Sequence, residues 1–233
     1  MQIKHNFNLK EYNSYKIEAT CAKAYFPDTE NDFVTIFTER TNTKRIILGG
    51  GYNMLFGKSH YDNDFIVIGE SFAEISLLPN GVIEVESGAS AKTLSEFALE
   101  NSLSGFEVFY DIPSSIGGAV VMNAGASGED IKDVLVKVRY LDLNDMKFKE
   151  MSKEDIGFIY RNSFFQKNTN TVVVKAWLQL KKVKTKEEIF NKMESIKNAR
   201  WAKQPREFPN AGSVFKRPEG FYVGTMIEQL GLK

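Results

Sequence analysis

The sequence predicts an α+β fold with mixed sheets. Short apolar runs of strand length alternate along the chain with segments whose apolar residues recur at helical spacing. Two later segments place apolar residues at every second position, and several helical segments follow a capping residue. The chain has 233 residues, which suits one large domain or two modest ones.

Two helices are predicted in the first half of the chain. Asn31 is expected to cap a helix that runs through Phe33 to Phe37. Ser90 is expected to begin a second helix, which stops before Gly105. Three apolar runs in the same half predict buried strands, at residues 45–48, 65–68 and, after the turn Asn80-Gly81, 82–85.

Two strands with period-two patterning are predicted in the second half. A hairpin turn at Asn144-Asp145 is expected to lead from the first of them into another strand. An apolar residue at every second position indicates a strand with one buried face. The residues expected on those faces are Val134, Val136, Val138 and Tyr140 in one strand, and Val172, Val174, Ala176, Leu178 and Leu180 in the other.

The segment after residue 184 is predicted to start with a long helix and then to form a separate unit. Thr185 and Glu188 fit a capping box. Ile189, Met193 and Ile196 would be the buried side of the helix. Pro205 and Pro209 then break the helical pattern, which makes this region the expected domain boundary.

Composition excludes several classes of protein. The 30 basic and 30 acidic residues balance, so no basic surface favours nucleic acid as a partner. No apolar run is long enough for a transmembrane helix, and the polar start lacks a signal-peptide core, so a cytoplasmic protein is expected. A single cysteine, Cys21, excludes an internal disulfide, and with only His5 and His60 beside it no metal site is expected.

A first glycine loop, residues 49–55, directly follows the predicted strand at 45–48. Its sequence is Gly-Gly-Gly-Tyr-Asn-Met-Leu, and consecutive glycines bring main-chain N–H groups together without side chains in the way. A simple tight turn would explain the glycines equally well. The pattern is neither a G-x-G-x-x-G fingerprint, because Met54 replaces the last glycine, nor a Walker loop, because Tyr52 replaces its first glycine.

A second glycine-rich stretch, residues 112–128, makes a ligand the better explanation. Small and apolar residues alternate there without a single charge, whereas a solvated loop would carry charged side chains. Glycine in a helix costs roughly 1 kcal/mol against alanine, so a loop is expected rather than a buried helix. Two such loops, each bordered by strands, favour a dinucleotide bound by main-chain N–H groups, with Ser and Asn adding polar contacts.

Five motifs together give the chain a family resemblance. In this order they resemble the UDP-N-acetylenolpyruvoylglucosamine reductases, and the likeness runs from about Asn8 to the last residue. The glycine loops also resemble those of the wider p-cresol methylhydroxylase/vanillyl-alcohol oxidase type of FAD domain. The motifs are Leu48-Gly-Gly-Gly-x-Asn53-x-Leu55, Ile112-Pro-x-Ser-Ile-Gly-Gly118, Met122-Asn-Ala-Gly125, Tyr160-Arg161-x-Ser163 and Asn210-Ala-Gly-Ser213-x-Phe215.

The resemblance implies a reaction and its cofactors. Family members reduce an enolpyruvyl ether on UDP-N-acetylglucosamine to a lactyl ether, in the peptidoglycan synthesis on which cell wall, cell shape and division depend. NADPH reduces bound FAD, whose N5 then passes hydride to the enol carbon distal to the ether. The implied partners are therefore NADPH and a UDP-sugar, with no metal, membrane or nucleic acid, and the full-length protein is implied to be a monomer.

The resemblance also implies roles for individual residues. Ser213 matches the serine that protonates carbon, Arg161 the arginine that faces the substrate carboxylate, and Tyr160 the adjacent active-site tyrosine. Lys203 resembles a substrate-binding lysine. FAD is expected to bind noncovalently, because the loops contain no His or Cys. The cofactor-binding residues implied are Gly49, Gly50, Gly51, Tyr52, Asn53, Met54, Leu55, Pro113, Ser114, Ser115, Ile116, Gly117, Gly118, Asn123, Ala124 and Gly125.

The implied architecture is a two-lobed FAD-binding domain over residues 15–183, with lobes of about 1–72 and 73–183. An incomplete α+β substrate-binding domain follows over 184–233. Family members continue past Leu230-Gly-Leu-Lys233 to a catalytic glutamate, so a truncated chain that binds FAD with little turnover is expected. Tyr52 and Ser114 depart from the family's usual serine and glycine at those positions.

Without the motifs, these residues have ordinary structural explanations. Arg161 would be a solvated arginine at a strand end, Ser213 a turn serine and Lys203 a lysine at the end of a helix. Cys21 would be a small buried apolar residue, and the two histidines would lie on the surface. Two other functions stay open: an FAD-dependent oxidase of the wider family, and a flavin-binding module without turnover.

Overall fold

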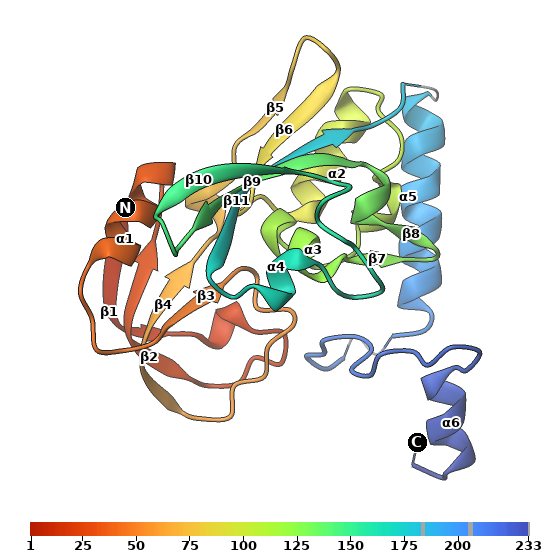
Figure 1. Ribbon diagram of the computed structural model, residues 1–233. Coiled ribbons are helices and arrows are strands. Elements are labelled where there is room, and N and C mark those ends of the chain that lie inside the picture. Colours follow the sequence, from red (N-terminus) through yellow and green to blue (C-terminus); the bar gives the residue numbers. More distant parts are fainter. Residues whose placement is uncertain (183–184, 205–206, 233) are drawn as a thin grey trace.

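The chain folds into two adjacent sheets, with helices on the outer sides and a C-terminal segment below (Figure 1). The computed structural model describes residues 1–182, 185–204 and 207–232. Val183 and Pro205, at which the sequence predicted a domain limit and a helix break, therefore lie outside the described residues, as does Lys233.

The first sheet is mixed, with the strand order β1-β2-β4-β3. β1 and β2 are antiparallel, while β4 runs parallel to both β2 and β3. Helix α1 (Glu30–Thr38) packs on this sheet through Phe33 and Ile36, which are fully buried. The strands are β1 (Gln2–Asn8), β2 (Thr20–Phe26), β3 (Arg45–Leu48) and β4 (His60–Val67).

The second sheet is antiparallel throughout, in the order β10-β9-β11-β6-β5. Strand β11 is central and is buried on both faces along most of its length, as a Val-rich run in mid-sheet favours. The strands are β5 (Ile75–Leu77), β6 (Val82–Glu86), β9 (Leu135–Asp142), β10 (Lys147–Ser152) and β11 (Thr171–Gln179).

Helices and a small hairpin cover the second sheet on the side away from the first (Figure 1). Their apolar residues build the largest core, with Phe106, Phe109 and Val120 fully or almost fully buried. The covering elements are α2 (Ala91–Glu100), α3 (Ile116–Met122), β7 (Gly125–Ala126), β8 (Glu129–Asp130), α4 (Phe164–Lys167) and α5 (Lys186–Trp201). Helix α6 (Val223–Gln229) lies in the C-terminal segment below them (Figure 1). Short 3₁₀ turns occur along the chain at Lys10–Tyr12, Glu70–Phe72, Glu107–Phe109 and Ile131–Asp133.

A shared core joins the two sheets. Tyr25 and Ile66 from the first sheet pack in one cluster with Leu141, Val172 and Val174 from the second. All five are buried, so separating the sheets would expose a continuous apolar surface. The sheets therefore form one body, whose strands come from residues 2–67 in the first sheet and 75–179 in the second.

Many local predictions are confirmed. The α+β class, the strands at 45–48 and 82–85, the cap at Ser90 and the β9–β10 hairpin are all present. Thr185 and Glu188 form the predicted capping box at the start of α5, where Ile189 and Met193 are 1% exposed. The strand predicted at 65–68 begins earlier, at His60.

The predicted cap of the first helix is wrong by two residues. Thr29, not Asn31, caps α1: its side chain accepts from the Asp32 N–H, and the Asp32 carboxylate accepts from the Thr29 N–H. This reciprocal pair satisfies two N–H groups, whereas a cap at Asn31 would satisfy one.

Two further expectations failed for reasons of packing. Residues 116–122, expected to be loop, form helix α3, because Gly117 lets the helix lie against Ser87; a Cβ there would be 2.8 Å from the Ser87 Cβ. Val136, expected to be buried, is 40% exposed, because the β9–β11 register shifts between Trp177 and Leu178 and skips it.

Candidate functional site

The two glycine loops meet in the structure. The first glycine loop, residues 49–55, leaves the end of β3, and the second glycine loop, the stretch of residues 112–128, includes α3. A Cβ built on Gly49 would lie only 2.5 Å from Oγ of Ser115. Two segments far apart in sequence therefore lie in contact, and any larger residue at position 49 would displace the Ser115 hydroxyl.

The first glycine loop leaves its main-chain donors free. Within the part of the chain that the structure describes, no N–H of residues 49–55 makes a hydrogen bond of normal geometry to a protein acceptor, although Tyr52 and Asn53 lie in a tight turn. The loop is nevertheless anchored: Leu48 before it is fully buried and Phe56 after it is 5% exposed. The Gly57 N–H donates to the Tyr61 hydroxyl at 3.0 Å. A loop that is anchored on both sides and has main-chain N–H groups without a protein acceptor can bind an anion.

The second glycine loop is built differently, and the expectation of main-chain donors along it is wrong for residues 116–119. The N–H groups of Ile116 and Gly117 donate to the carbonyls of Ala89 and Ser87, at 2.9 and 2.8 Å. Gly118 donates to Oγ of Ser115, the cap of α3, and Ala119 donates to the Ser115 carbonyl. These bonds fix the loop on the second sheet and leave side chains as its main donors.

Buried polar atoms without a protein partner gather around the second loop. Oγ of Ser114 lies in the loop itself, and Oγ of Ser87 lies beneath Gly117. Oδ1 of Asn123, at the end of α3, and Oε1 of Gln166, on α4, also lack a protein partner, and the two helices are in contact. Such groups cost free energy when they stay unsatisfied, so their clustering is typical of a polar ligand site.

Met122 connects the two loops. Its sulfur lies 3.4 Å from Nδ2 of Asn53 in the first loop and 3.4 Å from Nε2 of Gln166 on α4. The ring of Tyr52 covers Gly50, where a Cβ would be 2.2 Å from the ring, and Tyr52 is 42% exposed. An aromatic face therefore stands where the resemblance implied a serine hydroxyl.

The motifs at 122–125 and 160–163 form one structural unit. Asn123, 0% exposed with φ of 45°, ends helix α3, and its Nδ2 donates to the Ile159 carbonyl at 3.1 Å. Oγ of Ser163 donates to the Val121 carbonyl at 2.7 Å. In return, Nη1 of Arg161 donates to the Asn123 carbonyl at 2.9 Å.

Arg161 is held more tightly than a solvated arginine would be. Nη1 also pairs with the Asp130 carboxylate at 3.2 Å, and Nη2 donates to the Gly125 carbonyl. Its φ is +53°, an uncommon conformation that the surrounding contacts maintain. Nε and the rest of Nη2 have no acceptor among the described residues, and this pair of donors suits a carboxylate bound through both oxygens.

Tyr160 stands beside this guanidinium. Its ring centroid is 5.0 Å from the Arg161 guanidinium carbon, and its side chain is exposed. Tyr160 and Arg161 occupy the centre of a tight turn closed by the Asn162 N–H and the Ile159 carbonyl, at 3.1 Å. The turn presents both side chains next to the end of α3.

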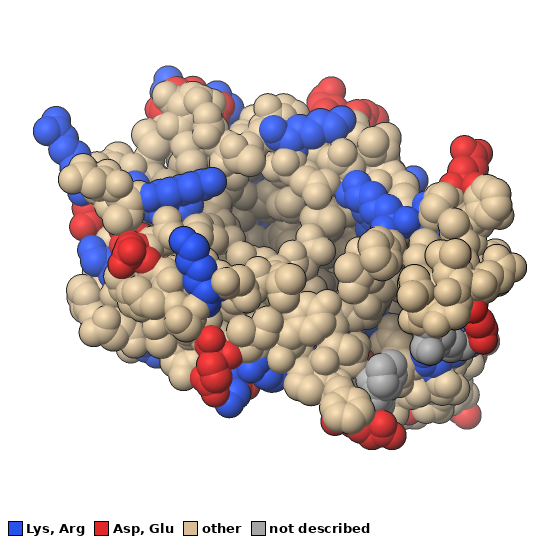
Figure 2. Space-filling view, turned by 90° about the horizontal axis from the view of Figure 1, so that it is seen from below, with Lys and Arg blue, Asp and Glu red and all other residues tan. Residues whose placement is uncertain are grey.

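The face of the molecule seen from below in Figure 1 is hollowed near its centre (Figure 2). The visible walls of the hollow are largely uncharged, and Lys and Arg side chains stand at its rim. A concave surface with uncharged walls and a basic rim favours a ligand that carries negative charge at its ends.

Comparison with known proteins agrees with these features. A family model described as an FAD binding domain matches residues 22–150. The chain is 37% identical to the UDP-N-acetylenolpyruvoylglucosamine reductase of Francisella tularensis, over 97% of this chain and 79% of that protein. It is 38% identical to the Syntrophomonas wolfei reductase, over 100% of this chain and 77% of that protein. The chain belongs to the UDP-N-acetylenolpyruvoylglucosamine reductase family.

Solved structures support the family and the fold. The UDP-N-acetylenolpyruvylglucosamine reductase of Thermus caldophilus superposes with a TM-score of 0.84 at 29% identity, over 100% of this chain and 81% of that one. An alkyldihydroxyacetonephosphate synthase and a cholesterol oxidase share the fold alone, with TM-scores of 0.51 and 0.55 and identities of 12% and 13%. The predicted family and the predicted FAD-domain fold class are confirmed.

Two site residues implied by the reductase family form no hydrogen bond or ion pair with the loops among the described residues. Ser213 is exposed, in a segment where the Gly212 N–H donates to Oδ1 of Asn210 at 3.2 Å. Lys203 is exposed just after α5, and its N–H donates to the Arg200 carbonyl.

Sequence reasoning missed the charged contacts that fix α5. Lys192 reaches the buried Glu107 at 3.4 Å and Glu129, on the β7–β8 hairpin, at 3.0 Å. Arg200 pairs with Asp111 at 3.4 Å, two residues before Pro113. Glu107 begins a 3₁₀ turn and Asp111 follows it by two residues, but no local pattern shows that a helix about eighty residues later contacts them.

The remaining candidates behave as ordinary structural residues. His5 and His60 are exposed, and Cys21 is fully buried, where burial raises the pKa of its thiol to about 11. In the described ranges no group of three or more His, Cys, Asp or Glu side chains is arranged to hold a metal ion. No helix in the described part of the chain is long and apolar enough to cross a membrane.

Proposed function

We propose that the protein is a flavoenzyme that uses NADPH to reduce the enolpyruvyl ether of UDP-N-acetylglucosamine enolpyruvate to UDP-N-acetylmuramate, for peptidoglycan synthesis. The observation that carries the proposal is the extent of the reductase likeness. Reductases match 97–100% of this chain, including the segment with Ser213, whereas the two distant flavoprotein folds match 71% and 76% of it at 12–13% identity.

The residues present fit noncovalent FAD. The free N–H groups of residues 49–55 would hold the pyrophosphate, since several main-chain donors close together bind phosphate oxygens. Ser114, Ser115 and Asn123 would supply polar contacts from the second side of the site. When bound, FAD accepts hydride from NADPH and delivers it to the enol carbon distal to the ether.

The chain's own residues would orient the substrate and move one proton. Arg161 would bind the enolpyruvyl carboxylate through Nε and Nη2, and the guanidinium stays charged throughout turnover. Tyr160 would close one side of this position, and Lys203 would bind the substrate. Ser213 would donate its hydroxyl proton to the carbon next to the one that receives hydride, once the C-terminal segment lies over the loops.

Two half-reactions followed separately test the proposal. The purified chain is saturated with FAD, mixed anaerobically with NADPH, and then mixed with the enolpyruvyl substrate. We expect the flavin absorbance to bleach in the first step and to return in the second, with one lactyl ether formed per flavin. Bleaching by an alcohol or a sugar without NADPH would identify an oxidase instead. Flavin that binds but is bleached by neither would identify a binding module without turnover.

A further inference from the structure

A loop ahead of the matched FAD-binding residues lies directly beneath the first glycine loop. We call residues 9–18, between β1 and β2, the Asn13 loop; it precedes residues 22–150 that match the FAD binding domain. Asn13 is 2% exposed, although asparagine is usually a surface residue. A buried polar side chain in a neutral loop implies that its hydrogen bonds perform a structural task.

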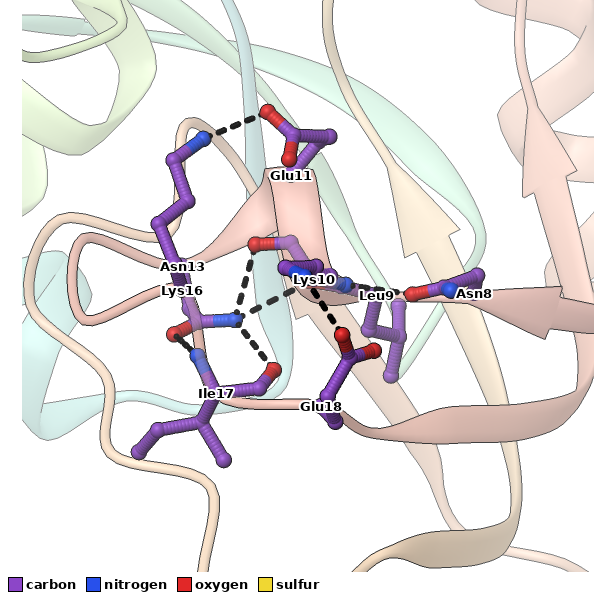
Figure 3. Close-up of polar contacts among 8 residues, drawn as sticks. All are labelled: Asn8, Leu9, Lys10, Glu11, Asn13, Lys16, Ile17 and Glu18. Atoms are coloured by element: carbon purple, nitrogen blue, oxygen red, sulfur yellow. Dashed lines mark hydrogen bonds and ion pairs between the residues drawn. The ribbon is translucent and has the colours of Figure 1, made fainter.

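Asn13 uses its whole amide group within the loop (Figure 3). Its Nδ2 lies 3.1 Å from each of the carbonyl oxygens of Leu9, Lys10 and Ile17, and its Oδ1 accepts from the Ile17 N–H at 2.9 Å. These contacts draw the two arms of the loop together and sustain a positive φ of 53° at Lys16. One side chain therefore determines the main-chain path of the loop.

The ion pairs of the loop contribute much less. Lys16 pairs with Glu11 at 2.6 Å and Lys10 with Glu18 at 2.5 Å, but all four side chains are more than 40% exposed (Figure 3). Exposed pairs of this kind are weak and are screened by salt. The shape of the loop thus depends on the buried amide of Asn13 rather than on the charges around it.

The main chain of the Asn13 loop packs directly against Gly51 of the first glycine loop. A Cβ built on Gly51 would lie 1.9 Å from the Tyr12 carbonyl oxygen and 3.2 Å from the Asn13 Cα. Gly51 also has φ of +69°, so it is left-handed as well as closely packed. With no side chain between them, a shift of Tyr12 or Asn13 must move Gly51 and the N–H groups beside it.

We propose that Asn13 is a positioning residue for the cofactor: by fixing the Tyr12 carbonyl under Gly51, it sets the direction of the free N–H groups of residues 49–55. The inference rests on the proposed binding of FAD pyrophosphate by these groups. Geometry matters here because hydrogen bonds weaken steeply when the donor turns away from the acceptor. The effect is expected on FAD affinity first, and on catalysis only through the bound flavin.

The test compares Asn13→Ala and Asn13→Asp with Ser95→Ala. Ser95 is 1% exposed and its Oγ contacts two carbonyl oxygens, those of Ala91 and Phe106, but it lies on α2 in the second lobe. FAD dissociation constants and apoprotein melting temperatures are measured for all three. We expect both Asn13 variants to lose at least about tenfold in FAD affinity, and Ser95→Ala to lose less than about threefold at a similar loss of melting temperature.

The aspartate variant identifies the cause. It has the shape of asparagine but turns an acceptor toward three carbonyl oxygens, so it should bind FAD no better than the alanine variant and should change the circular dichroism of bound flavin. FAD binding by the wild type with unchanged affinity in both Asn13 variants would refute the role of Asn13 and leave the proposed function intact. A wild type that fails to bind FAD would refute both.

Hydrogen exchange on the unmodified protein keeps the inference testable even if the variants do not fold. The amides of Lys16 and Ile17 donate to the Asn13 carbonyl and side chain, so their exchange reports on this loop. We expect FAD to slow exchange at these amides together with those of residues 49–55. Protection of residues 49–55 with no change at Lys16 and Ile17 would show that the two loops are uncoupled.

Discussion

In the first glycine loop no main-chain N–H of residues 49–55 makes a hydrogen bond of normal geometry within the described protein, whereas in the second the N–H groups of residues 116–119 all do. Both stretches are uncharged and glycine-rich, and the sequence suggested the same role for both. The glycines of the first leave donors to a ligand. Gly117 of the second instead lets α3 pack on Ser87.

The two loops also differ in what holds them. The neutral amide of Asn13 supports the first loop from below. The second is preceded by a segment tied to α5 by charged groups, Glu107 with Lys192 and Asp111 with Arg200. A neutral support is insensitive to pH and salt, while a charged one is not, so the loops should respond differently to solution conditions.

The largest expected effect separates the glycines of the two loops. Gly51→Ala would place a Cβ 1.9 Å from the Tyr12 carbonyl at φ of +69°, and we expect FAD affinity to fall by about 100-fold or more, or about 2.7 kcal/mol. Gly118→Ala is the matched control: its φ is not in the left-handed region, alanine is favoured in a helix by about 1 kcal/mol, and the atom nearest its Cβ, Oγ of Ser115, would lie 3.2 Å away and need to move only slightly. Fluorescence titration with FAD measures the affinity of both variants. Equal losses of FAD affinity would show that the two loops do not differ in how they bind the cofactor.

Ser213→Ala should leave both loops, and therefore FAD reduction by NADPH, unchanged. Reoxidation by the enolpyruvyl substrate should slow by about 100-fold, the usual effect of losing a positioned acid. Rapid mixing measures the two half-reactions separately. Equal damage to both would indicate that Ser213 supports the fold instead of donating a proton.

A smaller effect is expected on the stability of the fold at acidic pH, through Glu107. Although burial opposes it, hydrogen bonds from Ser104 and the Gly105 N–H, together with Lys192, hold the pKa of Glu107 below its ordinary 4.5. A depressed folded-state pKa stabilises the fold above the unfolded value, and this contribution is lost as pH falls through the folded pKa. Melting temperatures between pH 3 and 7 should therefore drop below about pH 4.5, by less in Glu107→Gln.

The same variant extends the comparison of the loops. Replacing the carboxylate should cost about 1–3 kcal/mol at neutral pH, because it removes charge-assisted bonds to Ser104 and Gly105. Hydrogen exchange in acid should then rise around residues 104–118 before it rises in the Asn13 loop. If hydrogen exchange rose at the same pH in both regions, the charged contacts near the second loop would not make it more sensitive to acid than the first loop.

The smallest expected effect is on the rate at which a thiol reagent modifies Cys21. Cys21 lies in the core beneath the first loop with Leu48 and Phe56, and with a pKa of about 11 it is almost wholly protonated at neutral pH. A thiol reagent should modify it only when this core opens, more slowly still with FAD bound. Rapid labelling of the native protein would show that the support of the first loop is looser than its packing indicates.

Local patterns in the sequence predicted much of the fold. Strand runs, the cap at Ser90, the capping box at Thr185 and the β9–β10 turn depend on residues a few positions apart, and all are present. The motifs also indicated the family and placed candidate binding residues in two loops that do meet, at Gly49 and Ser115. Short-range hydrogen bonding and side-chain periodicity are sufficient for the helices, strands and turns among these features.

Only the tertiary structure decided how hydrogen-bond donors are allocated. Residues 116–119 become helical and lose their free N–H groups because β6 and α2 bring the Ser87 and Ala89 carbonyls to them. Arg161 is held by carbonyls of Asn123 and Gly125, almost forty residues earlier, and Gly51 rests on Tyr12 at the same sequence distance. The sequence determined which groups could bind a ligand; long-range packing determined which of them are already used, because a partner distant in the chain leaves no local pattern.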